Sequence, residues 1–134
     1  MRLIFKQYGH RLIILKNTKR QHWMTNSYLR FLRLADTLVN SNEKPLDALS
    51  KEILEHISKN IILNEGKFVV GDILILKQIG SQATLHKRLH ALIADGYLKL
   101  KPADDGRVKQ IELTKKAHKY FSNLSQALEK AARA

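Results

Sequence analysis

The sequence predicts an α+β fold that is mostly helical, and three observations lead to this prediction. Apolar residues recur every three to four positions over most of the chain, which is typical of helices with one buried face. Two short runs within residues 97–113 alternate between apolar and charged side chains, as strands do. A short basic helix followed directly by a basic hairpin is the arrangement of a winged helix-turn-helix, which we therefore expect.

The N-terminal part, residues 1–44, combines apolar and basic segments. Apolar runs at residues 3–5 and 11–15 flank a turn with Gly9, which predicts a β-hairpin. Helix caps are available at residues 25–27, and the apolar stripe that follows is broader than one packing partner needs. We expect this helix to lie between elements or subunits. Its stripe consists of Tyr28, Phe31, Leu32, Ala35, Leu38 and Val39.

Two helices with a break between them are expected next. Pro45 suits a first helical turn, and the apolar spacing that follows marks a helix to about Asn60. Gly66-Lys67-Phe68 breaks this helix and predicts a short extended segment. Residues 70–79 predict the second helix, with Asp72 in its first turn, where the helix dipole favours an anion.

A third helix is predicted over residues 81–95, with Ser81 as its cap and Gly96 as its end. Its buried stripe is expected to be Leu85, Leu89, Leu92 and Ile93, and its outward residues Ala83, His86, Lys87 and His90.

Two strands and a long helix complete the chain. The strands are expected over residues 97–101 and 108–113, on either side of a loop formed by residues 102–106. The last helix carries apolar residues at helical spacing as far as the C-terminus.

The net charge of +12 is high for a chain of 134 residues, and it is unevenly distributed. Residues 1–44 carry nine Lys and Arg against two acids, whereas residues 45–80 carry four Lys against five acids. The remaining residues therefore hold a net charge of +6. A nearly neutral middle that packs, with flanks that face a polyanion such as nucleic acid, would give this pattern. A basic surface without a dedicated partner is the alternative.

The outward face of the helix over residues 81–95 carries groups that can read DNA. Lysine suits guanine or a phosphate, glutamine can pair with adenine, alanine can meet a thymine methyl group, and histidine can donate to bases. The capped helix start also suits one phosphate. An ordinary solvated face is the alternative, but the position before a basic hairpin favours DNA contact. The residues expected to contact DNA here are Ser81, Gln82, Ala83, Thr84, His86, Lys87 and His90.

The hairpin supplies a second set of cations. Arg107 and Lys109, beside two lysines of the preceding strand, would line the DNA backbone or a narrow groove. Alternatively, Asp104 and Asp105 neutralise these cations within a polar turn. If the loop contacts DNA, we expect Asp105 to orient Arg107 as the arginine reaches outward.

Several other kinds of site are not expected. His86 and His90 have a spacing at which two imidazoles share a metal, but no acidic or cysteine partner completes a site, so we expect no metal and no cofactor. No serine, histidine or aspartate lies in a nucleophile elbow or phosphate loop, so we expect no enzyme. The absence of cysteine excludes disulfides. No apolar run has the length of a membrane span, so we expect a cytoplasmic protein without a membrane partner.

Two interpretations of a further basic cluster stay open. Lys16, Lys19, Arg20 and His22 surround Trp23 and form either an additional nucleic-acid or partner contact or a mobile connector.

Several short motifs occur in a recognisable order and spacing. They are Ser81-Gln82-Ala83-Thr84-Leu85-His86-Lys87, Leu92, Gly96-Tyr97-Leu98, Asp105-Gly106-Arg107 and Leu113-Thr114. Over residues 45–121 this pattern resembles the multiple-antibiotic-resistance regulator (MarR) family of winged-helix proteins. Ala117 stands where that family usually has glycine, and the first 24 residues have no counterpart in it.

The resemblance implies a homodimer that regulates transcription, often as a repressor that releases DNA when a small ligand binds. It implies that residues 81–95 form the recognition helix, that Lys87 takes the place of a frequent arginine, and that Arg107 enters a minor groove. The expected dimerisation residues are Tyr28, Phe31, Leu32, Tyr120, Phe121, Leu124 and Leu128. Three of their aromatic rings, those of Tyr28, Tyr120 and Phe121, either line a ligand pocket or belong to the core, and their helical spacing favours the core.

The expected domains are an N-terminal basic segment and helix (residues 1–44), a winged helix-turn-helix DNA-binding domain (residues 45–113) and a C-terminal dimerisation helix (residues 114–134). Two other functions stay open. One is an architectural or replication-associated DNA-binding protein with little sequence preference, and the other is a winged-helix module that binds a protein partner.

Overall fold

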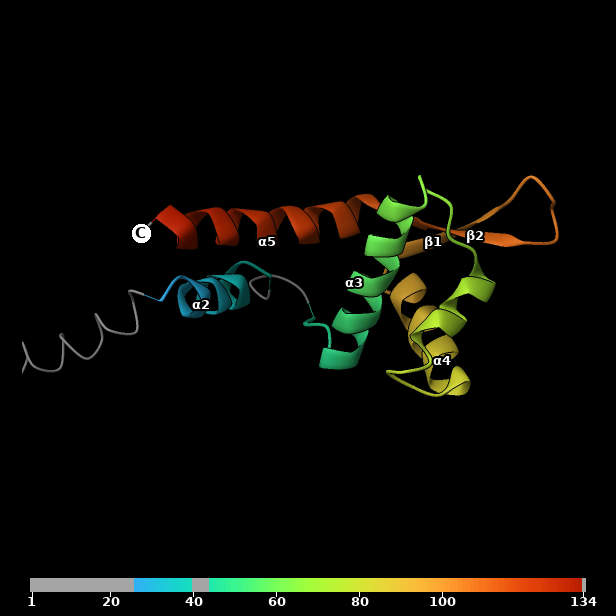
Figure 1. The fold of residues 1–134 in the computed structure, drawn as a ribbon, viewed down its shortest axis with the longest axis horizontal. Helices are drawn as coiled ribbons and strands as arrows, with labels where there is room; N and C mark the ends of the chain where they lie inside the picture. The colour runs from blue at the N-terminus through green and yellow to red at the C-terminus, as the bar shows by residue number, and fades with distance from the viewer. Residues whose placement is uncertain (1–25, 40–43, 134) are drawn as a thin grey trace, which may run out of the picture. The chain divides into compact units, whose positions relative to one another are not determined.

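The computed structural model of the chain describes residues 26–39 and 44–133 (Figure 1). These residues form a mostly helical α+β structure with a small antiparallel sheet, as predicted. The elements are α2 (Ser27–Val39), α3 (Ala48–Leu63), the 3-10 helix η1 (Val70–Leu76), α4 (Gln82–Ala94), β1 (Leu98–Pro102), β2 (Lys109–Leu113) and α5 (Lys115–Arg133). The hairpin expected at residues 3–15 and the basic cluster around Trp23 lie outside the described residues.

The chain divides into two compact units. The central unit is Lys44–Phe121, and the terminal unit joins the described residues of Met1–Glu43 to Ser122–Ala134. Most contacts of each unit lie within that unit.

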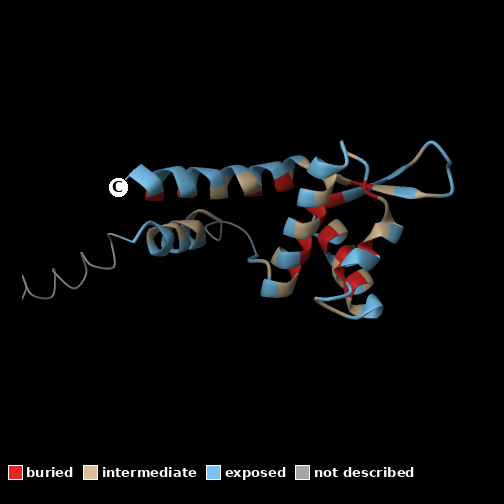
Figure 2. Cartoon of the chain, in the orientation of Figure 1, coloured by how far each residue is buried: buried red, intermediate tan, exposed pale blue. Residues whose placement is uncertain are grey.

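The core of the central unit lies where α3, η1, α4 and the hairpin meet (Figure 2). Its largest fully buried side chains are Ile53, Leu54, Ile57, Phe68, Ile73, Leu85, Leu89, Leu92, Leu98 and Ile111. Every predicted core leucine of α4 is among them, because residues three or four apart lie on one face of a helix. This buried face fixes which side of α4 is left for other contacts.

The start and end of α3 differ from the prediction. The helix begins at Ala48, after Pro45, because the Asp47 carboxylate accepts a hydrogen bond from the Ser50 backbone N–H at 2.8 Å and so caps the helix. It continues beyond Asn60 to Leu63. Both ends are therefore shifted towards the C-terminus.

The helix expected over residues 70–79 is present as a 3-10 helix, Val70–Leu76, followed by a turn, so it ends earlier than predicted. Gly71 and several β-branched neighbours disfavour an α-helix. The two buried side chains, Ile73 and Leu76, are three residues apart, which matches the 3-10 repeat. Asp72 does lie in the first turn, where its carboxylate accepts from the Val69 N–H at 2.9 Å.

The predicted ends of α4 are confirmed. The Ser81 hydroxyl accepts from the Thr84 N–H at 3.2 Å, which caps the helix start. At the other end, Gly96 has a φ of +85°, and the N–H groups of Gly96 and Tyr97 donate to the carbonyls of Ile93 and Leu92. This pair of bonds is a Schellman motif, which turns the chain directly into β1.

The hairpin has a regular register from Leu98 opposite Leu113 to Pro102 opposite Lys109. The segment after α3 also joins it, because Val69 forms a bridge with Gln110 and the Ile111 N–H donates to the Phe68 carbonyl at 2.7 Å. The short extended segment predicted near Phe68 is therefore present, and it ties α3 to the sheet.

In the terminal unit, α2 runs antiparallel to the last turns of α5 (Figure 1). The Arg30 guanidinium donates to the Ala131 carbonyl from Nε at 3.1 Å and from Nη2 at 2.6 Å. The Asn123 amide donates to the Leu38 carbonyl at 3.4 Å. Each helix thus supplies a donor to the carbonyl end of the other, where the helix dipole favours positive charge.

Candidate nucleic-acid interface

The outward face of α4 carries the predicted DNA-contacting residues. Leu85, Leu89 and Leu92 point into the core, so the opposite side of the helix faces outward. Ser81, Gln82, Ala83, Lys87 and His90 are exposed, while Thr84 and His86 are half-buried. The helix therefore presents one lysine and one histidine on a surface otherwise formed by small or uncharged polar groups.

The start of α4 is held by two hydroxyl groups. Ser81 Oγ accepts from the Thr84 N–H and donates to Thr84 Oγ1 at 3.0 Å. The first backbone bond of the helix runs from the Leu85 N–H to the Ser81 carbonyl at 2.9 Å. The N–H groups of Gln82 and Ala83 precede this bond and point along the positive end of the helix dipole, which suits a phosphate.

The loop between the strands, residues 103–108, projects beyond the body formed by α3 and α4 (Figure 1). Arg107 and Lys109 are both exposed. The Arg107 N–H contacts the Asp105 carbonyl oxygen, so backbone atoms make the contact between these two residues. Within residues 44–133, the Arg107 side chain forms no ion pair with Asp104 or Asp105. The expected orientation of Arg107 by Asp105 is therefore not found.

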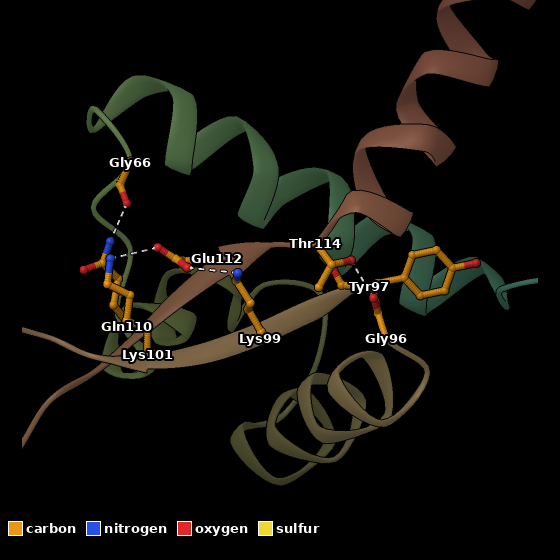
Figure 3. A network of polar contacts seen from close by, with 8 residues as sticks. All are labelled: Gly66, Gly96, Tyr97, Lys99, Lys101, Gln110, Glu112 and Thr114. Carbon is orange, nitrogen blue, oxygen red and sulfur yellow. Dashed lines mark hydrogen bonds and ion pairs between the residues drawn. The ribbon is translucent and has the colours of Figure 1, made fainter.

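The two strand lysines have a different acidic partner, Glu112 of β2 (Figure 3). Lys99 Nζ lies 3.6 Å from Glu112 Oε1, and Lys101 Nζ lies 3.2 Å from Glu112 Oε2. Sequence analysis missed this cluster, although the alternation of the two strands places all three side chains on one face of the sheet. The pairs are exposed and add little stability, but they neutralise part of the positive charge of the strands.

Two polar side chains fix the hairpin within the central unit (Figure 3). The Gln110 amide donates to the Gly66 carbonyl at 2.8 Å, which joins β2 to the turn after α3. The Thr114 hydroxyl contacts the carbonyls of Gly96 and Tyr97 and accepts from the Ala117 N–H at 3.3 Å. Thr114 therefore joins the end of α4, the start of β1 and the start of α5, so the hairpin is anchored to the outward-facing helix.

A second missed contact involves Arg88, which follows Lys87 on α4. Its guanidinium forms an ion pair with the carboxylate of Asp47, the cap of α3. The two residues are 41 positions apart in the sequence, and no local pattern indicates their contact.

The positive charge of the central unit is concentrated on its second half. Residues 44–80 contain five Lys against five acids, whereas residues 81–121 contain nine Lys and Arg against four acids. Among these nine cations, Lys87, Arg107 and Lys109 form no ion pair with any residue that the structure describes. These three are therefore the cations most accessible to an external anion on α4 and the hairpin.

The expected dimerisation residues fall into three groups. Tyr28, Leu32 and Leu128 are exposed, and Phe31, Phe121 and Leu124 are half-buried. Tyr120 is buried in the central unit, with its ring edge-on to that of Tyr97 at 5.9 Å, as the core interpretation expects for this residue. Burial, with a further contribution from the charge of Glu55, raises the pKa of Tyr120 to about 12.

In residues 26–39 and 44–133, no group of three His, Cys, Asp or Glu side chains is arranged to hold a metal ion. In the same residues, no helix has both the length and the apolar character needed to cross a membrane. Comparison of the chain with protein-family models, characterised proteins and solved structures gave no match.

Proposed function

We propose that this chain is a winged helix-turn-helix protein that binds double-stranded DNA. In this proposal α3, η1 and α4 are the three helices, α4 enters the major groove, and the β1–β2 hairpin is the wing. The observation that carries the proposal is the accessibility of Lys87 on α4 together with Arg107 and Lys109 on the adjoining hairpin. A helix and a loop with accessible cations, joined through Thr114, can contact a groove and its flanking phosphates together.

Within this class, we propose a homodimeric regulator of transcription, in line with the resemblance to the MarR family. Exposed apolar side chains of the terminal unit, those of Tyr28, Leu32 and Leu128, support a second copy as partner. A two-fold dimer would place its two recognition helices in successive major grooves, ~34 Å apart, on a palindromic site. Bound there, the protein would block polymerase, and a small ligand would release it.

A second candidate is a DNA-binding protein with little sequence preference. It is favoured by the number of lysines on α4, the hairpin and the start of α5, because lysine contacts with phosphates carry no sequence information.

Selection of bound sequences from random duplexes distinguishes these candidates. We expect an enriched palindrome for the natural chain and a weaker or relaxed one for Lys87→Ala, because the lysine would contact base edges. Lys59→Ala is the matched control, since Lys59 is an exposed lysine on α3 and belongs neither to α4 nor to the hairpin. Salt-dependent binding without enrichment would support the second candidate, and no binding at all would overturn both.

A further inference from the structure

The ion pair between Arg88 and Asp47 lies at the edge of the proposed DNA-contacting surface. Arg88 is one residue after Lys87 and four after Thr84, on the flank of α4 between its buried and outward faces. The side chains of Arg88 and Asp47 are 34% and 52% exposed, so a phosphate could reach the guanidinium. The pair is thus placed where DNA would compete with Asp47 for the guanidinium.

Asp47 has two partners in this position. Its Oδ1 accepts from the Ser50 N–H at 2.8 Å, and its Oδ2 pairs with Arg88 Nη1. The hydrogen bond from Ser50 and the positive charge of Arg88 lower the pKa of Asp47, so the carboxylate is charged at neutral pH. Since one oxygen caps α3, the other stays in place to hold Arg88.

We propose that Asp47 withholds Arg88 from DNA phosphates and thereby limits binding of the protein to DNA of any sequence. This inference rests on the proposed function. It divides the cations of α4 into two roles: Lys87 is available to the groove, whereas the neighbouring Arg88 is neutralised within the chain. A freed arginine would add a phosphate contact that carries no sequence information.

The test measures how the affinity for a random-sequence duplex depends on salt. Each phosphate contact contributes about 0.9 to the slope of log K against log salt. Asp47→Asn removes the charge but keeps a side chain that caps helices well. We expect its slope to be steeper than that of the natural chain by about 0.9, with several-fold tighter binding at low salt.

Three further variants make the test specific. Arg88→Gln alone should leave the slope unchanged, and Asp47→Asn combined with Arg88→Gln should return it to the natural value. Glu52→Gln is the matched control for the loss of one negative charge, because Glu52 is exposed on the same helix. Its slope should change by less than half as much as that of Asp47→Asn.

The outcomes separate this inference from the proposed function. If the natural chain binds no duplex, the proposed function fails. If it binds but Asp47→Asn leaves the slope unchanged, the inference alone is overturned. Should Asp47→Asn lose helical structure by circular dichroism, Arg88→Gln still decides, because a fall of its slope by about 0.9 would show that Arg88 already contacts DNA.

Discussion

Gly96 sets the direction in which the chain leaves α4. Its φ of +85° lies in the left-handed region, where a side chain costs roughly 1–2 kcal/mol. A Cβ added there would lie 3.8 Å from Lys116 Cδ, an ordinary contact, so the cost comes from the backbone. We expect Gly96→Ala to lower the free energy of unfolding by about 1–2 kcal/mol, as measured by urea denaturation.

Gly71→Ala is the control for this substitution. An added Cβ at Gly71 meets nothing within 4 Å, and its φ is not positive. Because alanine relieves the entropy cost of glycine without strain, this variant should be neutral or slightly more stable. Equal losses for the two variants would contradict the role given to the backbone at Gly96.

Tyr120 makes the stability depend on pH in the alkaline range. Its pKa is raised to about 12 in the folded chain, whereas an unfolded tyrosine ionises near pH 10. The stability that this group contributes is complete below pH 10 and is lost as the pH rises towards 12. We expect Tyr120→Phe to lose less in Tm between pH 9 and 11.5 than the natural chain does.

Exposed Tyr28 provides the comparison for this prediction. Tyr28→Phe should follow the natural chain over the same pH range, because it removes one exposed hydroxyl group and leaves the buried Tyr120 in place. If the natural chain and the Tyr120→Phe variant lost the same amount of Tm between pH 9 and 11.5, groups other than Tyr120 would be the cause.

At the scale of single elements, the hairpin carries two kinds of cation. Lys101 lies 3.2 Å from Glu112, whereas Arg107 forms no ion pair with any described residue. If the hairpin contacts DNA, we expect Arg107→Ala to reduce the slope of log K against log salt by about 0.9. Lys101→Ala should reduce this slope by less than half as much. Equal reductions for the two variants would show that the ion pair with Glu112 does not keep Lys101 from DNA.

The elements that could be predicted from the sequence are those with local signals. Ser81 and Gly96 mark the ends of α4 through their own caps and backbone angles, and the alternation of residues 97–113 marks the strands. These signals need no knowledge of the rest of the fold. The predicted outward face of α4 follows from them, since its leucine stripe defines the opposite side.

The features that could not be predicted depend on contacts between distant segments or on fine backbone geometry. Residues 70–79 have apolar spacing that fits an α-helix and a 3-10 helix about equally well, and packing of Ile73 and Leu76 selects the second. The ion pair between Asp47 and Arg88 requires the packing of α3 against α4. The Glu112 cluster was within reach of sequence reasoning, but only once the strand register was specified.

At the scale of the whole molecule, both units carry a net positive charge and exposed apolar side chains. Residues 81–121 carry an excess of five positive charges, whereas residues 44–80 are balanced. The terminal unit exposes Tyr28, Leu32 and Leu128, side chains that a solvated surface does not require. The central unit exposes large apolar side chains as well, those of Ile62, Leu63, Leu74, Ile75 and Leu100, so exposed apolar surface occurs in both units.

The proposed homodimer can be tested by a substitution at Leu128. This side chain is 57% exposed and so contributes little to the packing of a single chain. We expect Leu128→Glu to convert a dimer into a monomer in sedimentation equilibrium, because a charge would be buried at the interface without a partner. Gln126→Glu, at another exposed position of α5, introduces the same charge and should leave the dimer intact. The natural chain sedimenting as a monomer would remove the two-fold arrangement altogether.

The same variant connects assembly to DNA binding. A dimer engages two half-sites, and once the first is bound the second contact forms at a high effective concentration, so the dimer binds a palindrome far more tightly than a single half-site. The Leu128→Glu monomer should keep its affinity for a single half-site but lose at least ten-fold on the palindrome. Equal losses of affinity for the half-site and the palindrome would show that the substitution damages the proposed DNA-contacting surface itself. An unchanged affinity for the palindrome would mean that each chain binds DNA independently, which favours the candidate with little sequence preference.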